Sequence, residues 1–440
     1  MASTYLSRTQ GSGNRQIFTQ SFWCKIADPS GTQTLAGTFD DSNNYNYCYL
    51  DGGNLKLQWK ASGSVTATLD TNRKLRDTNA FYNIVYAVDT TQSTASDRIK
   101  LYINGVQETS FSTATYPTLN RYTEVNANNI THRIGSIDGS QQYFNGIMSY
   151  VAHIDGTQEL PTIFGETDAT TGEWKIKTAI TPSVGWGTNG FLILKDGNSL
   201  TDQSSNSNNF TLGGGTLTNT EDCPDNVFAT MNPLDNYYPN YTFANGNTTV
   251  TTGGNYSYPQ ATIYVNTGKW YWECKVISKT GGGDEYMIGI QGKSVTGTNS
   301  PAQSNNGYTI YATDGQVYGW GATASYGSAY TAGDIIGVAL DCTNNKIYWS
   351  KNGSWMGSGN PSTGSNGYSI NAANTTAQGG YSPVAGFYDS PNAVFSFNFG
   401  NGFFGTTAIS SEGTNASGIG KFEFDVPANY TALSTKGLNL

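Results

Sequence analysis

Short segments of alternating or continuous apolar residues recur along almost the whole chain, and Gly, Asn, Asp and Ser separate them. An alternation of period two predicts a half-buried β-strand, and a short continuous apolar run predicts a strand that is buried on both faces. Helical periodicity is nearly absent. The clearest strand segments are Gln20–Ile26, Asn54–Trp59, Phe81–Val88, Lys269–Val276 and Ala393–Phe399.

Two Asn-Gly dipeptides mark tight hairpin turns. Asn104-Gly105 directly follows the strand segment Arg98–Ile103, and Asn352-Gly353 follows Lys346–Lys351. This dipeptide supplies the positive φ angles that a two-residue hairpin connection requires. Only Leu160–Phe164 is typical of a short helical turn, because a proline lies near its start and a glycine follows its end.

The pattern predicts an all-β fold with two antiparallel β-sandwich, jelly-roll-like domains in tandem. We expect the first domain to cover residues 1–230, the second 231–405, and a C-terminal extension 406–440. The connection lies within residues 221–252, which are polar, contain three prolines and lack strong alternation. In the extension, Phe422–Phe424 is a candidate for a short strand.

Composition limits the possible partners. Aromatic residues make up 13% of the chain and charged residues only 12%, a balance opposite to that of disordered chains. The net charge is −9 and no Lys/Arg cluster occurs, so a nucleic-acid partner is not expected. No apolar segment approaches the length of a membrane span and the N-terminus lacks an apolar signal segment, so no membrane partner is expected either.

The number of cysteines is odd and their spacings are wide. No C-x-x-C motif occurs, so neither a disulfide framework nor a zinc site is favoured. We expect all of them to be buried free thiols of a protein made in a reducing compartment. They are Cys24, Cys48, Cys223, Cys274 and Cys342.

Four motifs follow one another in the second half: Gly268–Glu273, Gly333–Asp341, Tyr348–Gly353 and Phe397–Gly400. In this order they resemble a SPRY domain, a β-sandwich recognition module. The resemblance covers about residues 240–405 and implies a binding rather than a catalytic role for that half.

A second resemblance covers the first half, which is similar to the concanavalin-like or laminin-G-like jelly rolls of phage structural proteins. The residues that carry it are Ser21–Lys25, Asp97–Gly105, Tyr143–Gly146, Phe164–Trp174 and Asn206–Phe210. The order of jelly roll, Phe228–Leu234 and SPRY domain, together with the ending Phe422–Pro427, resembles proteins of tailed phages.

A glycan-degrading jelly-roll enzyme of a phage tail is the alternative function. Such an enzyme needs facing carboxylates, which on one strand means an i, i+2 spacing. The nearest set, Glu166, Asp168 and Glu173, follows a helical turn and is expected to be a loop held by hydrogen bonds. His132 and His153 lie outside any nucleophile motif, and His153 is expected to be structural. We therefore expect no catalytic residue, no cofactor and no enzymatic activity.

No metal site is expected, although jelly rolls often hold calcium. The only candidate ligands are Asp40 and Asp41 in one loop and Asp196 with Asp202 in another. Neither loop matches a defined calcium motif, and hydrogen-bonded turns explain both.

Tyrosines and polar loops are the remaining candidates for a binding surface. Tyr45, Tyr47 and Tyr49 alternate, which predicts one face of a strand. The segments 292–308 and 356–367 are rich in Gly, Ser, Asn and Thr and poor in core residues, so packing does not explain their length. Either they are connectors or they contact a ligand; the sequence does not locate the site.

Together these observations predict a non-enzymatic virion surface protein, either tail- or fibre-associated or a capsid decoration. Its expected roles are host-surface or glycan recognition and virion assembly. Its expected partners are other virion proteins and a host cell-surface glycan or receptor. We expect a homo-oligomer or many copies on a particle, with synthesis in the host bacterial cytoplasm.

Overall fold

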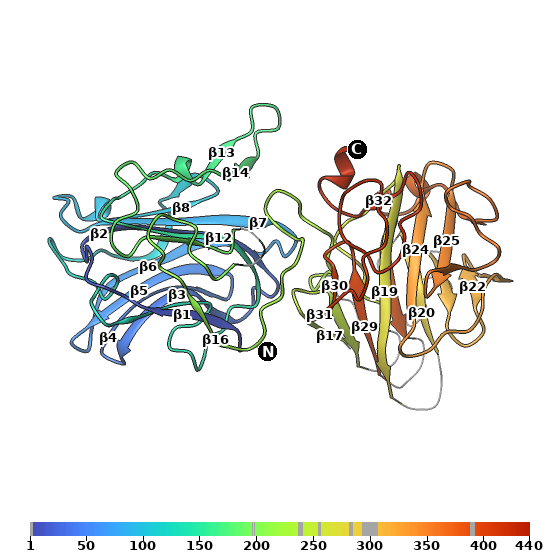
Figure 1. The fold of residues 1–440 in the computed structure, drawn as a ribbon, viewed down its shortest axis with the longest axis horizontal. Coiled ribbons are helices and arrows are strands. Elements are labelled where there is room, and N and C mark those ends of the chain that lie inside the picture. The colour runs from blue at the N-terminus through green and yellow to red at the C-terminus, as the bar shows by residue number, and fades with distance from the viewer. Residues whose placement is uncertain are drawn as a thin grey trace. The chain divides into compact units, whose positions relative to one another are not determined.

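The computed structural model describes residues 3–195, 197, 199–235, 241–253, 257–280, 285–292, 307–387 and 392–440. The chain divides into two compact units, Met1–Asn219 and Thr220–Leu440. Each unit contains two large β-sheets with an apolar core between them (Figure 1). The predicted all-β class with two sandwiches in tandem is therefore confirmed.

The first unit consists of an eight-stranded and a six-stranded sheet. In spatial order the eight-stranded sheet contains β10 (Phe111–Thr115), β6 (Ser64–Lys74), β5 (Asn54–Ala61), β4 (Asn44–Asp51), β3 (Thr32–Asp41), β11 (Thr131–Ile134), β1 (Tyr5–Thr9) and β16 (Thr211–Gly214). The six-stranded sheet contains β15 (Phe191–Ile193), β12 (Gly146–Asp155), β2 (Ile17–Ile26), β7 (Phe81–Asp89), β8 (Ile99–Ile103) and β9 (Val106–Glu108). A separate hairpin is formed by β13 (Gly165–Thr167) and β14 (Trp174–Ile176).

The second unit consists of a nine-stranded and a five-stranded sheet. The nine-stranded sheet contains β17 (Tyr241–Ala244), β18 (Thr249–Thr252), β29 (Ala393–Asn398), β19 (Lys269–Lys279), β24 (Ile335–Asp341), β25 (Lys346–Lys351), β26 (Ser354–Trp355), β27 (Tyr368–Ser369) and β32 (Thr431–Ala432). The five-stranded sheet contains β23 (Ala322–Ser325), β22 (Gln316–Gly319), β21 (Gly307–Tyr311), β20 (Tyr286–Gln291) and β28 (Ser382–Phe387). A short hairpin joins β30 (Phe403–Phe404) and β31 (Thr407–Ala408).

Helical structure in the described residues is limited to four 3₁₀ turns, none of them long or apolar enough to cross a membrane. They are η1 (Ala95–Asp97), η2 (Pro161–Ile163), η3 (Ala373–Thr375) and η4 (Gly437–Asn439). The second of these confirms the helical turn predicted around Leu160–Phe164.

The Asn-Gly turns occur where the sequence predicts them. Asn104 and Gly105 have φ angles of 49° and 76° and connect β8 to β9. Gly105 is also required by packing, because a Cβ atom there would lie 2.5 Å from ring atoms of Trp174. The hairpin β13–β14 carries Trp174, and its tip from Asp168 to Glu173 is the hydrogen-bonded turn that the sequence predicts, whereas Glu166 lies on β13.

The two sheets of the first unit differ in how many of their faces are covered. In β2 and β7 nearly every residue is buried, whereas buried and partly exposed residues alternate in β4 and β5. The segment between β12 and β15 explains the difference, because Phe164 and its neighbours pack on the outer face of the six-stranded sheet. Alternating burial is the mark of a sheet with one solvated face, so the outer face of the eight-stranded sheet is the open one.

The C-terminal segment is part of the second sandwich. Phe422 is completely buried in its core, although Phe422–Phe424 forms no strand, contrary to the prediction. Both 220–230 and 406–440 lie in the second unit, whereas the sequence analysis assigned them to the first domain and to an extension. The two ends of the unit meet, since Phe228 pairs with Ser434 and the Ala229 amide donates to the Leu433 carbonyl at 2.9 Å.

Glu273 on β19 fastens this C-terminal segment. Its buried carboxylate accepts hydrogen bonds from the amides of Glu423 and Phe424, both at 2.9 Å, and from Tyr271 Oη and Asn398 Nδ2, both at 3.1 Å. Burial raises the pKa of Glu273 to about 7, and these four hydrogen bonds oppose that rise. One carboxylate therefore accepts hydrogen bonds from side chains of the core strands and from backbone amides of the C-terminal segment, and Asn398 Nδ2 donates in addition to the Lys421 carbonyl at 2.9 Å.

A buried polar cluster occupies the core of the first unit. Gln20 Nε2 lies 3.2 Å from both His132 Nε2 and His153 Nδ1, and Gln20 Oε1 accepts a hydrogen bond from Tyr86. Donation by the amide makes both of those ring nitrogens acceptors, so His153 carries its proton on Nε2 and donates to Asn126 Oδ1 at 2.9 Å. Burial lowers the pKa of His132 to about 3 and that of His153 well below its ordinary value.

We predict that Glu273→Ala destabilises the second unit by about 2–4 kcal/mol, because it removes the acceptor of the Glu423 and Phe424 amides and of the Tyr271 hydroxyl. The thermal transition of that unit should fall, and limited proteolysis should cut within 406–440. Glu273→Gln, which keeps one acceptor oxygen, should be intermediate. The matched control is Glu166→Ala on the hairpin β13–β14, where the carboxylate is 46% exposed; a loss of stability as large in this control would contradict the assignment.

We also predict opposite responses of the two units to acid. The histidine pKa values are depressed in the folded state, so stability is complete above about pH 6.5 and is lost as the pH falls below it. At pH 5 the loss is about 2 kcal/mol for each buried histidine. The second unit holds no histidine, and the pKa of its buried Glu273 is raised to about 7, so this unit gains stability as the pH falls from 7.5 to 5. Calorimetry of the whole chain at pH 7.5 and 5 should therefore move only the first unit's transition downward; equal shifts would refute the idea.

Candidate functional site

The open face of the eight-stranded sheet carries a row of aromatic side chains. On β4, Asn46, Cys48 and Leu50 are buried, so the residues between them project from the other face of the strand. Tyr45, Tyr47 and Tyr49 therefore share the outer face, as their spacing predicts. Phe39 on β3 lies opposite Tyr45 in the register and extends the row toward β11. We call these four residues the aromatic ladder.

Ring contacts hold the aromatic ladder together. The ring centroids of Phe39 and Tyr45 are 6.2 Å apart with nearly parallel planes. The distance is 5.0 Å from Tyr45 to Tyr47 and 4.5 Å from Tyr47 to Tyr49. All four side chains are partly exposed. The ladder therefore offers a continuous apolar strip on an otherwise polar face.

Polar groups of β5 fix the ladder's hydroxyl groups. Gln58 Oε1 accepts hydrogen bonds from Tyr45 at 2.9 Å and from Tyr47 at 3.0 Å. Lys60 Nζ lies 5.8 Å from the centroid of the Tyr45 ring. Burial, more than the neighbouring tyrosines, raises the pKa of Tyr47, so its hydroxyl stays protonated at physiological pH. Both bonded hydroxyl groups keep lone pairs with which to accept hydrogen bonds from a ligand.

Two carboxylates meet at one end of the ladder, a pairing that the sequence analysis missed. Lys56 Nζ lies 3.0 Å from Asp51 Oδ2 and 3.1 Å from Asp70 Oδ2. The hydrogen bond from Lys56 lowers the pKa of Asp51. Because the three residues come from β4, β5 and β6, only the cross-strand register brings them together. The lysine between them compensates the charge of both carboxylates.

A pocket of about 630 Å³ opens on the same sheet at the edge formed by β1, β11 and β16. Its walls are side chains of these strands and of the loop before β16. The sequence analysis did not identify this pocket. The lining residues are Tyr5, Ser7, Arg8, Thr9, Thr131, Arg133, Ser207, Asn208, Asn209 and Thr211.

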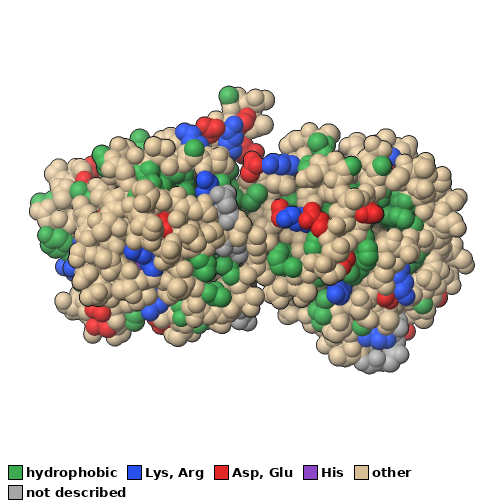
Figure 2. All heavy atoms as spheres, viewed as in Figure 1, with side chains coloured by type: hydrophobic (Ala, Val, Ile, Leu, Met, Phe, Trp, Pro, Cys, Tyr) green, Lys and Arg blue, Asp and Glu red, His purple; other side chains and the backbone are tan. Residues whose placement is uncertain are grey.

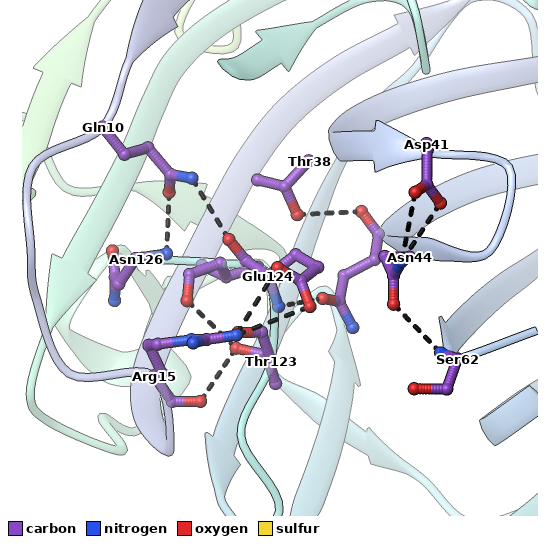
Figure 3. Close-up of polar contacts among 11 residues, drawn as sticks. Gln10, Arg15, Thr38, Asp41, Asn44, Ser62, Thr123, Glu124 and Asn126 are labelled. Carbon is purple, nitrogen blue, oxygen red and sulfur yellow. Dashed lines mark hydrogen bonds and ion pairs between the residues drawn. The ribbon is translucent and has the colours of Figure 1, made fainter. Parts of the chain in front are cut away.

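The loop before β11 is held by hydrogen bonds to the segment between β1 and β2 (Figure 3). Arg15 Nε donates to the Thr123 carbonyl at 2.6 Å and Arg15 Nη2 lies 3.4 Å from Glu124. Gln10 Oε1 accepts a hydrogen bond from the Asn126 amide at 2.7 Å. Because side chains and backbone are cross-linked in this way, the conformation of this loop is fixed.

The calcium candidates lie in hydrogen-bonded turns. Asp41 accepts from the Asn43 amide at 2.6 Å and from the Asn44 side chain, and Figure 3 shows the second contact. Asp202 accepts from the amides of Leu192 and Asn208 at 2.8 and 2.7 Å. Asp40 is exposed. Asp196 lies outside the described residues. Within the described part of the chain, no three His, Cys, Asp or Glu side chains gather at a possible metal site.

The other candidates serve structural roles in the structure. Asp168 accepts hydrogen bonds from the amides of Thr170 and Thr171 at the tip of the hairpin β13–β14. Four of the five cysteines are buried free thiols, but Cys223 is partly exposed, which corrects the expectation for that residue.

The segment 356–367 is anchored to the second sandwich at a few positions, while residues 362–366 are exposed. Met356 is buried in the second core, and Gly359 and Gly367 lie against the ring of Tyr348. Ser362 Oγ accepts a hydrogen bond from the Ala428 amide at 3.0 Å. The other polar segment, 292–308, falls almost entirely outside the described residues.

Charged side chains are scattered singly over the surface. In the view of Figure 2, uncharged polar side chains and backbone cover most of both units, and blue and red atoms occur in small groups. This distribution agrees with the 12% share of charged residues.

Comparison with protein families assigns both units. The family described as the concanavalin A-like lectin/glucanases superfamily matches residues 2–159, and the SPRY domain family matches residues 269–402. The chain therefore carries a concanavalin A-like domain followed by a SPRY domain, the order that the resemblances imply.

Similarity to curated proteins is confined to a short region. Ran-binding protein 9 of Danio rerio is 35% identical over 92 residues, which are 20% of this chain and 15% of that protein. The Ran-binding proteins 9/10 homolog of Drosophila melanogaster is 32% identical over 97 residues, or 22% of this chain and 10% of that protein. The chain thus spans only a small part of the length of these relatives, which are animal proteins.

Solved structures share only general architecture with this chain. The SPRY domain of human HERC1 covers 38% of this chain and 96% of its own, with 20% identity and a TM-score of 0.28. A heptameric SAP-like pentraxin from Limulus polyphemus covers 34% of this chain and 70% of its own, with 15% identity and a TM-score of 0.27. Likeness at this level supports no inference about function.

Proposed function

We propose that this protein is a non-enzymatic recognition protein whose concanavalin A-like unit binds an oligosaccharide on the open face of its eight-stranded sheet. The aromatic ladder is the observation that carries this proposal. Sugar rings present flat C–H faces that pack on aromatic rings, and their hydroxyl groups bond to the polar groups between those rings. Phe39, Tyr45 and Tyr47 supply the rings, while Gln58 and Lys60 supply polar groups on the neighbouring strand.

The charge state of Asp51 supports binding without hydrolysis. Glycoside hydrolysis requires one protonated carboxylic acid beside a second carboxylate. The hydrogen bond and ion pair with Lys56 lower the pKa of Asp51, which favours its ionised form.

We extend the proposal to a virion. The order of a concanavalin A-like and a SPRY unit, followed by Phe422–Pro427, supports a surface protein of a tailed-phage particle, tail- or fibre-associated or decorating the capsid. In this scheme one sandwich recognises the host surface, and the other docks on a virion protein or on further copies of the chain. The support for this part is the sequence resemblance alone.

We predict that Tyr47→Ala weakens oligosaccharide binding about tenfold, because it removes the ring that contacts both neighbours in the ladder. Glycan-array screening followed by calorimetric titration measures the effect. Tyr318→Ala in the second unit is the matched control and should bind like the unchanged protein. Unaltered affinity of the Tyr47 variant, or release of reducing sugars during incubation, would contradict the proposal.

For the virion, we expect quantitative mass spectrometry of purified particles to detect the protein in fixed stoichiometry to the major capsid protein. Hundreds of copies would assign it to the capsid, and a handful to the tail or a fibre. Its consistent absence from particles would refute the virion part of the proposal and leave the glycan-binding part standing.

A further inference from the structure

The pocket at β1, β11 and β16 has an unusual charge balance for this chain. The net charge of the protein is −9, yet two arginines and no carboxylate line this pocket. The remaining lining residues are Tyr5, serines, threonines and asparagines. A pocket with this lining attracts an anionic ligand. Its polar side chains can also form hydrogen bonds with hydroxyl groups of that ligand.

The two arginines are not equivalent. Arg8 is engaged by the loop before β16, because its Nη2 donates to Asn208 Oδ1 at 2.6 Å and its Nη1 lies 3.4 Å from the Asn189 carbonyl. Arg133 forms no ion pair with a described carboxylate, and its buried Nη1 has no hydrogen-bond partner among the described residues. A buried guanidinium nitrogen without an acceptor is costly, so a ligand that supplies the acceptor is strongly favoured.

The pocket and the aromatic ladder lie on the same face of the same sheet. Thr9, Thr131, Phe39 and Tyr45 are successive partners across β1, β11, β3 and β4. Arg133 follows Thr131 at an interval of two residues on β11, and therefore projects on the same side. Since neighbouring strands are about 4.8 Å apart, β11 and β4 are separated by about 10 Å. An oligosaccharide of a few residues can reach from the ladder into the pocket.

We propose that this pocket binds the carboxylate of an acidic sugar residue, and that Arg133 is the group that recognises it. The inference rests on the proposed glycan-binding function and specifies the ligand class of that face. The planar guanidinium group matches a carboxylate with two parallel hydrogen bonds. Ser7, Thr131 and Thr211 surround it with hydroxyl groups that suit the ring hydroxyls of a sugar, and Tyr5 offers an aromatic ring.

The test uses the full chain, with α-1,4-linked oligogalacturonate and a sialylated oligosaccharide as probes and the carboxyl-reduced form of each as its neutral counterpart. We expect at least one acidic probe to bind about 10- to 100-fold more tightly than its reduced form. Arg133→Gln should abolish this preference without changing affinity for the reduced form. Arg133→Lys should keep part of the preference, because lysine retains the positive charge but cannot form two parallel hydrogen bonds to the carboxylate. Arg76→Gln, at an exposed site, is the matched control.

The outcomes separate this inference from the proposed function. Equal binding of acidic and reduced probes, or an acid preference that survives in Arg133→Gln, would overturn the inference while Tyr47→Ala still tests the ladder. A preference for sulfated over carboxylated glycans would also overturn it. If no glycan binds and Tyr47→Ala changes nothing, both proposals fail. Circular dichroism and thermal unfolding of each variant establish that a lost preference does not result from lost folding.

Discussion

The covering of one sheet face by the segment between β12 and β15 decides the organisation of the first unit. A strand has two faces, and a two-sheet sandwich buries only one face of each sheet. Here Phe164, Trp186 and their neighbours bury the outer face of the six-stranded sheet as well. That sheet can consequently use continuous apolar strands, and the alternating, polar-faced strands belong to the eight-stranded sheet. The open face, with its aromatic ladder and its pocket, exists because only the six-stranded sheet is covered on both faces.

Buried polar side chains determine specific pairings within both cores. In the first unit, Gln20 bonds to His132 and His153 and so joins β2 to β11 and β12, which belong to different sheets. In the second unit, Glu273 ties a central strand to the C-terminal segment. Apolar packing alone tolerates many arrangements, whereas a polar group with a fixed set of partners excludes those that leave it unpaired. These two clusters therefore specify which segments meet.

Much of the fold could be predicted from the sequence, because strand alternation and Asn-Gly turns are local signals. Asn104-Gly105 and Asn352-Gly353 occur where expected. The burial of Phe422 and the contacts of residues 356–367 could not be predicted, because their partners are distant in sequence. The site was only partly foreseeable. The alternation of Tyr45, Tyr47 and Tyr49 predicts their common face, but the Asp51–Lys56–Asp70 contact and the pocket around Arg133 depend on cross-strand register.

The meeting of the two ends of the second unit has a consequence for modularity. Phe228 pairs with Ser434, and Lys436 forms an ion pair with Asp225. The N-terminal and C-terminal segments of this sandwich therefore lie side by side. A unit closed in this way can be spliced into a surface loop of another protein without stretching its host, since the gap to be bridged is small. The same geometry permits circular permutation, with a short linker joining the present ends and new termini opened in a surface turn such as Asn352-Gly353. The SPRY unit can therefore be inserted at different positions of a longer chain without a change in its core.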